Sequence, residues 1–240
     1  MRLTRLAYLL AAHPLRLHQA LVRRGLALQW IDAFRPYWEV VRPPSLPLTD
    51  YASFTWLEYH FAQVARARHP VGDHFDDPDF QLGRLLSYVK RRELHPLRML
   101  PAIWALHECD TVLEFGSGAA PYAYARVGLP PRQWITLADL PGPLFDYVKW
   151  QYRDTDTVDW QAPEEALECP WDGIVCTEVL EHLPDPLETV QRMTKQAPHI
   201  VFDYTPMSAP GPRYAVFRHF ETTGVLTGPD PRGLYRWHRA

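Results

Sequence analysis

The chain has 240 residues, of which 47% are hydrophobic and 22% are charged, with a formal net charge of −3. This composition supports one large domain, or a core domain with a smaller attachment, and excludes a disordered chain or a strongly basic nucleic-acid-binding protein. The three cysteines, Cys109, Cys169 and Cys176, form no C-x-x-C pair and no zinc-ligand spacing. They favour a reducing, cytoplasmic setting and predict no metal centre.

The first thirty residues carry five arginines and no acid before Asp32, among leucines at helical spacing. This pattern favours an amphipathic helix that packs on its own protein. A targeting peptide or a helix that contacts a membrane surface is the alternative. The longest uninterrupted apolar stretch, residues 6–12, is far shorter than the roughly 20 residues that span a bilayer. We therefore expect no transmembrane helix.

Residues 1–108 are predicted to form a helical region, because apolar residues recur at the spacing of an amphipathic helix. Pro36 is expected to end the second of these helices. Prolines between residues 42 and 49 predict a stiff connector, and the acidic residues of 69–79 predict a loop. The expected helices cover residues 3–12, 15–34, 51–68, 82–94 and 97–106.

After Cys109 the sequence changes to short β-like runs that alternate with helical ones. This alternation predicts an α/β domain over residues 109–240, with a mainly parallel sheet and helices on both faces. The expected strands cover residues 111–115, 134–138, 157–161, 173–177 and 200–204, followed by 225–227 and 234–237.

The run from Thr111 to Pro121 reads Thr-Val-Leu-Glu-Phe-Gly-Ser-Gly-Ala-Ala-Pro. A hydrophobic strand leads into Gly116 and Gly118, which permit a tight turn and a close approach of a ligand to the backbone. Pro121 suits the first turn of a helix, where its missing N–H costs nothing. The pattern predicts a ligand site at the carboxyl end of this strand.

Two acids flank this turn. Glu114 lies at the end of the strand, where a carboxylate can interact with a cationic ligand. Asp139 follows Gly118 by 21 residues and ends the next strand, where an acid can accept the hydrogens of ribose hydroxyls. Pro121 occupies the last glycine place of the G-x-G-x-x-G pattern, which counts against a nicotinamide-dependent oxidoreductase.

Two segments resemble one family. The run Val-Leu-Glu-Phe-Gly-Ser-Gly resembles motif I of class I S-adenosylmethionine-dependent methyltransferases. Residues 171–186, Trp-Asp-Gly-Ile-Val-Cys-Thr-Glu-Val-Leu-Glu-His-Leu-Pro-Asp-Pro, resemble their fourth-strand motif in the subgroup that includes ubiquinone-biosynthesis O-methyltransferases. The resemblance covers residues 111–205 and implies a Rossmann-like fold with S-adenosylmethionine as cofactor.

The resemblance also implies where the cofactor would lie. Glu114 would be near its amino group, Asp139 would hold the ribose and Leu140 would touch the adenine. Members of the family often have an acid after the third strand that contacts the adenine amino group. In this chain Gln161 lies nearer to that position than Asp159 does. The expected cofactor residues are Glu114, Phe115, Gly116, Ser117, Gly118, Asp139, Leu140, Gln161, Thr177 and Glu178.

Candidate proton acceptors follow the fourth strand at Glu178, Glu181 and His182. A helix that starts there would place Glu178 and His182 four residues apart on one face. A base is needed only when the acceptor group holds a proton, and a purely structural His182 is the alternative. Tyr204 and Met207 follow the fifth strand and are expected to help form the acceptor pocket.

The favoured function is methyl transfer to a small-molecule acceptor, with O-methylation slightly preferred and the N-terminal helices forming a lid. A methyltransferase that acts on nucleic acid or protein is ranked lower. Its basic cluster, residues 90–92, is small and the sequence pI is near 6.4. A non-catalytic protein that kept the fold remains a third interpretation.

Overall fold

A computed structural model describes residues 29–41, 51–68, 77–91, 95–204, 210–231 and 233–240. The helix expected over residues 3–12, residues 15–28 of the second expected helix, the connector over 42–49 and most of the loop over 69–79 lie outside the described residues. The chain divides into two compact units. One extends to Arg98 and also contains Pro141–Trp150, and the other comprises Met99–Leu140 and Gln151–Ala240.

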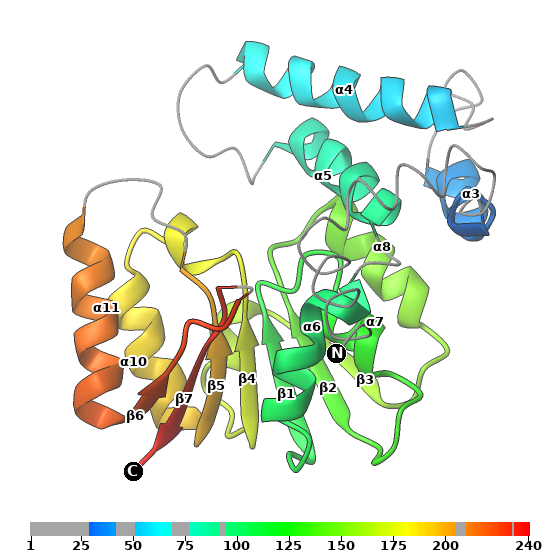
Figure 1. Ribbon diagram of the computed structural model, residues 1–240. Helices are drawn as coiled ribbons and strands as arrows, with labels where there is room; N and C mark the ends of the chain where they lie inside the picture. Colours follow the sequence, from blue (N-terminus) through cyan, green and yellow to red (C-terminus); the bar gives the residue numbers. More distant parts are fainter. Residues whose placement is uncertain (1–28, 42–50, 69–76, 92–94, 205–209, 232) are drawn as a thin grey trace, which may run out of the picture. The chain divides into compact units, whose positions relative to one another are not determined.

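The second unit contains a seven-stranded sheet in the order β3-β2-β1-β4-β5-β7-β6. Strands β1 to β5 are parallel, whereas β7 runs antiparallel to β5 and to β6 (Figure 1). The predicted α/β fold with a mainly parallel sheet is therefore confirmed. The strands are β1 Thr111–Phe115, β2 Trp134–Ala138, β3 Val158–Gln161, β4 Gly173–Cys176, β5 His199–Phe202, β6 Gly224–Thr227 and β7 Tyr235–Arg239.

The fifth strand ends earlier than the sequence suggests. It stops at Phe202, so Asp203 and Tyr204 lie in the loop that follows. The side chain of Asp203 accepts a hydrogen bond from the backbone of the loop after β4, which draws the chain out of the sheet. The parallel register brings Phe115, Ala138 and Gln161 to the same edge of the sheet.

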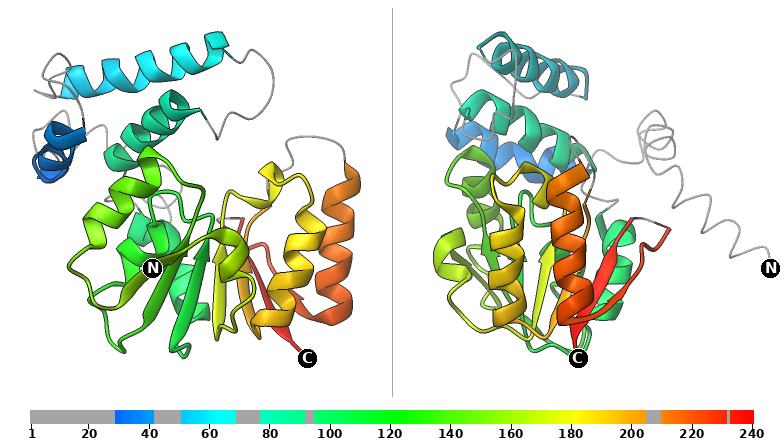
Figure 2. Two further views of the ribbon diagram at one scale, coloured as in Figure 1. Left: turned by 180° about the vertical axis from the view of Figure 1, so that it is seen from behind. Right: turned by 90° about the vertical axis from the view of Figure 1, so that its left-hand side faces the viewer.

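Helices cover both faces of this sheet. Leu113, Ile174 and Phe202 belong to a buried cluster with α9 (Pro163–Ala166), α10 (Pro186–Gln196) and α11 (Pro210–Thr223). On the other face, a Cβ added at Gly173 would lie 2.8 Å from Leu106, which follows α6 (His95–Ala105). Figure 2 shows α10 and α11 (yellow and orange) on one side of the sheet and α6 (green) on the other. Strand residues therefore alternate between two buried layers, as expected for a parallel sheet.

Proline and a polar cap begin the helix after β4. Asp185 accepts a hydrogen bond from the amide of Glu188 over 2.9 Å, and Pro186 occupies the first turn of α10. This start matches the rule that an N-cap side chain satisfies an otherwise unpaired amide. It also explains why the loop after β4 ends where it does.

The first unit contains α3 (Gln29–Val41), α4 (Tyr51–Arg68), α5 (Pro78–Arg91) and most of α8 (Pro143–Tyr152). The sequence expected a helix that ends before Pro36, which is wrong, because α3 continues through Pro36. The rings of Phe34 and Tyr147 lie 5.2 Å apart, and the hydroxyl of Tyr37 donates to the carbonyl of Pro143. Burial on either side of Pro36 offsets the one helical hydrogen bond that proline cannot make.

Helix α5, which corresponds to the helix expected over residues 82–94, begins earlier than expected. Asp77 accepts hydrogen bonds from the amides of Asp79 and Phe80 at 2.8 and 3.0 Å, and Pro78 follows it in the first turn. This cap starts the helix at Pro78 rather than at residue 82. Within the described part of the chain, no helix has the length and apolar character needed to cross a membrane.

Candidate functional site

The turn between β1 and α7 (Pro121–Arg126) has an unusual backbone. Gly116, Gly118 and Ala120 all adopt positive φ angles, of 63°, 54° and 53°. The amide of Ser117 donates to the carbonyl of Ala138 over 3.0 Å, which fixes the turn against the end of β2. Glycine is suited to two of these positions because it has no Cβ to clash in the left-handed region. The turn therefore folds over the carboxyl edge of the sheet, as the sequence predicted.

The space beside Gly116 belongs to another loop of the chain. A Cβ added at Gly116 would lie 2.2 Å from Cγ2 of Val179, in the loop after β4. The sequence suggested that a ligand requires the missing side chain, but at Gly116 the close neighbour is Val179. Glycine there permits contact between the two loops that surround the edge.

Glu114 is buried, with 2% of its surface exposed. Its carboxylate oxygens accept hydrogen bonds from the amides of Tyr122 and Ala123, at 2.8 and 2.9 Å, in the first turn of α7. Burial raises the pKa of Glu114 to about 8, although the two backbone hydrogen bonds lower it. The side chain thus connects β1 to α7 and supports the glycine turn from beneath.

Asp139 directly follows β2 and lies next to the same turn. Its carboxylate accepts hydrogen bonds from the amide of Gly118 and, at 2.7 Å, from the amide of Leu140. Asp139 is partly exposed and Leu140 is 43% exposed. An acid and an apolar side chain therefore stand side by side at the edge, with the acid held in place by the glycine turn.

Two of the predicted cofactor residues have a buried polar atom without a hydrogen-bond partner among the described residues. One is Oε1 of Gln161, at the end of β3, and the other is Oγ of Ser117, in the glycine turn. Gln161 lies opposite Ala138 in the register, whereas Asp159 is exposed. A buried acceptor or hydroxyl without a partner costs about 1–3 kcal/mol, so such atoms favour a polar ligand.

The loop after β4 corrects one prediction. Glu178 adopts a left-handed conformation with φ 57°, and only a short 3₁₀ helix, Leu180–His182, follows it. Glu178 and His182 therefore do not share the face of one α-helix. The amide of Glu178 donates to Asp203, 25 residues further along the chain, which diverts the backbone from helical geometry. Thr177 links this loop to the end of β4.

Glu181 and Asp203 add to the negative charge at this edge. Oε2 of Glu181 is buried without a hydrogen-bond partner, and Asp203 is 7% exposed. Burial and the neighbouring Asp203 raise the pKa of Glu181, whereas His182 lowers it. The sequence analysis missed Asp203, although an acid directly after a buried strand is a recognisable indication of this edge.

Tyr204 follows Asp203 and is partly buried, with its ring 6.3 Å from that of Phe217 in α11. Burial and the charge of Glu181 raise the pKa of its hydroxyl. Met207, the other predicted acceptor residue, lies outside the described residues. The parallel strands thus bring one group of predicted residues to a single edge: Glu114, Phe115, Gly116, Ser117, Gly118, Asp139, Leu140, Gln161, Thr177, Glu178, His182 and Tyr204.

Acids dominate the electrostatics of this edge. The carboxyl of Asp139 raises the pKa of Glu114, and Glu178 contributes to the raised pKa of Glu181. Among the described residues, no group of three or more His, Cys, Asp and Glu is arranged to hold a metal ion. A cluster of acids near one edge attracts an organic cation, because each carboxylate gains a favourable Coulomb interaction.

Comparison with known proteins identifies the fold. No protein-family model and no curated protein sequence matches the chain. A proposed O-methyltransferase from Nostoc punctiforme PCC 73102 superposes with a TM-score of 0.51 at 12% identity, over 78% of this chain and 71% of that protein.

Two further structures are similar at lower scores. N-methyltransferase NodS from Bradyrhizobium japonicum WM9, in complex with S-adenosylhomocysteine, has 16% identity over 78% of this chain and 97% of NodS, with a TM-score of 0.46. Human N-acetylserotonin methyltransferase, in complex with S-adenosylmethionine, has 14% identity over 79% of this chain and 68% of that enzyme, with a TM-score of 0.47. The chain has the fold of class I S-adenosylmethionine-dependent methyltransferases.

Proposed function

We propose that the protein is an S-adenosylmethionine-dependent methyltransferase that acts on a small-molecule acceptor, with O-methylation favoured. The observation that carries this proposal is the pair formed by Gly118 and Asp139. The left-handed glycine turn and the acid are held together by a hydrogen bond at the carboxyl edge of a parallel sheet. Ligands of open α/β sheets bind at this edge.

The residues present fit this cofactor. S-adenosylmethionine is a cation with many polar groups, and the edge offers an excess of carboxylates. Ser117 and Gln161 each have a buried polar atom that lacks a partner, and both atoms belong to the predicted cofactor residues. A polar ligand would remove the cost of leaving these atoms unpaired.

Each residue has a proposed part in binding. Asp139 accepts the hydrogens of the ribose hydroxyls, and the exposed side chain of Leu140 packs on the adenine. Gln161 hydrogen-bonds the adenine amino group through its unpaired oxygen. Glu114, whose oxygens already accept two backbone amides, keeps α7 and the glycine turn in position.

The bound cofactor supplies an electrophilic methyl group on sulfur. The protein aligns the acceptor and excludes water, and such positioning accounts for about 7–11 kcal/mol of a barrier in favourable cases. When the acceptor is an alcohol, a base must take its proton. Glu178, Glu181 and His182 are the candidates, and the raised pKa of Glu181 makes its carboxylate a stronger base than usual.

Calorimetric titration tests the cofactor assignment. The purified protein should bind S-adenosylmethionine and S-adenosylhomocysteine, and should not bind NAD. Asp139→Ala should weaken binding by about 1–3 kcal/mol, the usual loss when a buried hydrogen-bonding partner is removed. Asp159→Ala is the matched control, because Asp159 is exposed on β3 and makes no proposed contact. Binding of NAD alone, or equal affinity of the Asp139→Ala variant, would contradict the proposal.

A labelled methyl group identifies the acceptor class. The protein is incubated with methyl-labelled cofactor and a cell extract, which is then separated into small molecules, protein and nucleic acid. Label in the small-molecule fraction supports the proposal. Label only in a macromolecular fraction would favour a nucleic-acid or protein methyltransferase, and cofactor binding without transfer would favour a non-catalytic protein.

The helical region over residues 1–108 is proposed to help choose the acceptor. Its helix α4 exposes two large aromatic side chains, Trp56 and Tyr59, at 56% and 64%. Exposed aromatic side chains are common contacts for ligands because they offer apolar area at little entropic cost. The remainder of the chain already contains the strands and loops that cofactor binding requires.

A further inference from the structure

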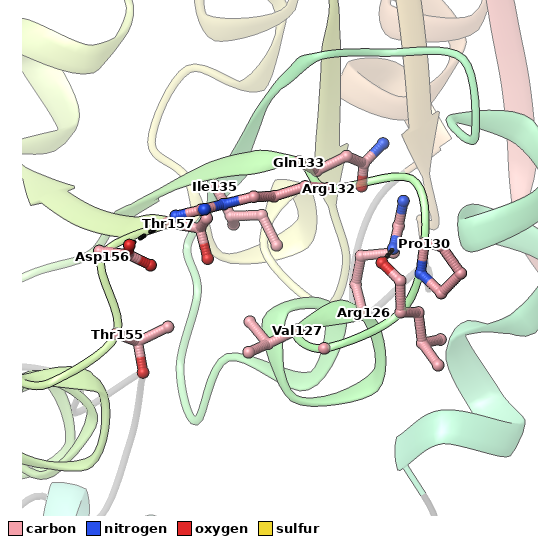
Figure 3. Close-up of a pocket in the computed structure, with 11 residues that line it drawn as sticks. Arg126, Val127, Pro130, Arg132, Gln133, Ile135, Thr155, Asp156 and Thr157 are labelled. Carbon is pink, nitrogen blue, oxygen red and sulfur yellow. Dashed lines mark hydrogen bonds and ion pairs between the residues drawn. The ribbon is translucent and has the colours of Figure 1, made fainter.

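A pocket of about 480 Å³ opens at the amino ends of β2 and β3. It is enclosed by the segment that follows α7 and by the loop before β3. Figure 3 shows Arg126 and Pro130 on one side and Thr155, Asp156 and Thr157 on the opposite side. Ile135, which lines the pocket, precedes Asp139 by four residues, or about 13 Å along a strand. The pocket is therefore separate from the candidate cofactor edge.

Arg126 is the main source of charge in this pocket. Only 3% of its surface is exposed, and its terminal nitrogens donate to the carbonyls of Leu129 and Pro131. Its Nε–H is buried without a partner. Among the residues that the structure describes, no carboxylate forms an ion pair with this guanidinium. A buried cation without a counter-charge is costly, because the carbonyl groups compensate only part of its lost hydration.

A second arginine in the pocket already has its own partner. Arg132 lies 2.6 Å from Asp156, and both side chains are mostly exposed, at 59% and 83%. This pair stands at the rim, where solvent screens it, and it leaves no net charge. The unmatched positive charge of the pocket is therefore that of Arg126.

The remaining walls combine apolar surface with hydroxyl groups. Val127, Leu129 and Ile135 supply apolar atoms, while Thr155 and Thr157 supply hydroxyls. A volume near 480 Å³ lies within the range of about 300–1,000 Å³ that is usual for small-molecule sites. The pocket thus suits a ligand with an apolar body and one anionic group.

We propose that this pocket binds a small organic anion, a carboxylate with an apolar body, whose charge is matched by Arg126. The ligand would supply the missing negative charge beside the Arg126 guanidinium, and two opposite charges attract more strongly where little solvent screens them. The short helix α7 begins at the glycine turn and ends at Arg126, so the pocket and the cofactor edge share one element.

A purely structural role for Arg126 is the competing explanation. The residue lies in the last turn of α7, where backbone carbonyls favour a cation. Its two hydrogen bonds also hold the segment from Leu129 to Pro131. That role accounts for the two terminal nitrogens, but for neither the unpaired Nε–H nor the pocket that Arg126 lines.

The experiment is a calorimetric titration with sodium benzoate, compared with benzamide, its neutral counterpart of the same shape. Each titration is made with and without S-adenosylhomocysteine. Benzoate that binds at the candidate cofactor edge would be displaced by S-adenosylhomocysteine, whereas benzoate in this pocket would not. The proposal expects one saturable site for benzoate, retained in both conditions, and about tenfold or more weaker binding of benzamide. Its outcome does not depend on whether the protein transfers methyl groups.

Three variants locate the binding. Thr155→Trp fills the pocket from a partly exposed position and should abolish benzoate binding while the melting temperature stays unchanged. Arg126→Gln should weaken binding about tenfold or more if it folds. Arg132→Ala is the matched control, and its effect should be small because its charge is already paired at the rim.

Clear outcomes would overturn the proposal. Absence of saturable benzoate binding, or equal affinity for benzoate and benzamide, contradicts a site that matches the charge of Arg126. Unchanged affinity in folded Thr155→Trp would place the ligand elsewhere. If Arg126→Gln does not fold, Thr155→Trp still tests whether benzoate binds in this pocket, and benzamide still tests whether its charge is required.

Discussion

The backbone amide of Glu178 donates a hydrogen bond to Oδ1 of Asp203, 2.5 Å away, across the loops that follow β4 and β5. Glu178 has a φ of 57°, a conformation that costs a residue other than glycine about 1–2 kcal/mol. The next residue, Val179, then packs against Gly116 of the glycine turn. Asp203 thus stabilises a strained backbone that connects the loop after β5 to the glycine turn.

The first prediction tests this connection. Asp203→Ala should weaken binding of S-adenosylhomocysteine by about 1–3 kcal/mol, because Glu178 loses the partner that holds its left-handed backbone. Adding Glu178→Gly should restore part of the affinity, since glycine adopts that conformation without strain. Calorimetry on both single variants and the double variant measures the effect. Failure of glycine to recover any affinity would show that Asp203 acts in another way.

The second prediction concerns the space beside Gly116. Gly116→Ala should lower the free energy of unfolding, because its Cβ would overlap Val179 and φ is 63°. Val179→Ala in the same chain should recover part of the loss by removing the overlapping methyl groups. Denaturant unfolding of the single and double variants is the measurement. Equal stability of the two variants would argue against the packing of these two loops.

The third prediction is a dependence of stability on pH. Folded Glu114 keeps its proton up to about pH 8, whereas the unfolded side chain loses it near the ordinary value of 4.5. The folded state therefore binds more protons in this window, and its stability should fall as the pH rises through it and level off above it. Glu114→Gln should remove this part of the slope.

That substitution should also destabilise the protein above about pH 8, where the Glu114 carboxyl of the folded protein is ionised. Glutamine has one carbonyl oxygen for the amides of Tyr122 and Ala123, so one amide of α7 would lose its acceptor. The expected cost is about 1–3 kcal/mol. Urea unfolding of both proteins from pH 5 to pH 9 provides the comparison. Parallel pH profiles would mean that Glu114 does not titrate in this range.

The fourth prediction concerns acceptor choice. Trp56→Ala should raise KM for the acceptor found by the labelling assay and leave cofactor affinity unchanged, because Trp56 is exposed on α4. The substitution removes a ring that stacks on His60 at 5.0 Å, without opening the buried core. Trp134→Ala is the control, since Trp134 is exposed to the same 56% but begins β2. Equal KM values for these two variants would mean that α4 takes no part in acceptor recognition.

The elements near the candidate cofactor edge were predictable because their sequence patterns are local. β1 and β2 have the predicted bounds, since each is an apolar run that ends at a glycine or an acid. The loop after β4 was not predictable in the same way. Its run of residues is compatible with a helix, and the hydrogen bond that prevents one comes from Asp203, 25 residues away.

In the helical region too, one helix was predictable from local sequence and another depends on a distant residue. Helix α4 was located from its apolar spacing, and its observed bounds are the predicted ones. The continuation of α3 through Pro36 depends on Tyr147, more than a hundred residues further along the chain, whose ring packs against Phe34. Local propensity alone would end the helix, and burial outweighs it.

By itself, the sequence determined the order of strands and helices, the glycine turn and the acid that follows β2. Each of these features depends on residues that are adjacent in the sequence. Only the tertiary structure decided that Glu114 supports α7, that Val179 occupies the space beside Gly116 and that Arg126 has no counter-charge among the described residues. These relationships join segments that no local pattern relates. They arise because close packing and the pairing of buried polar groups are satisfied only when the whole chain is folded.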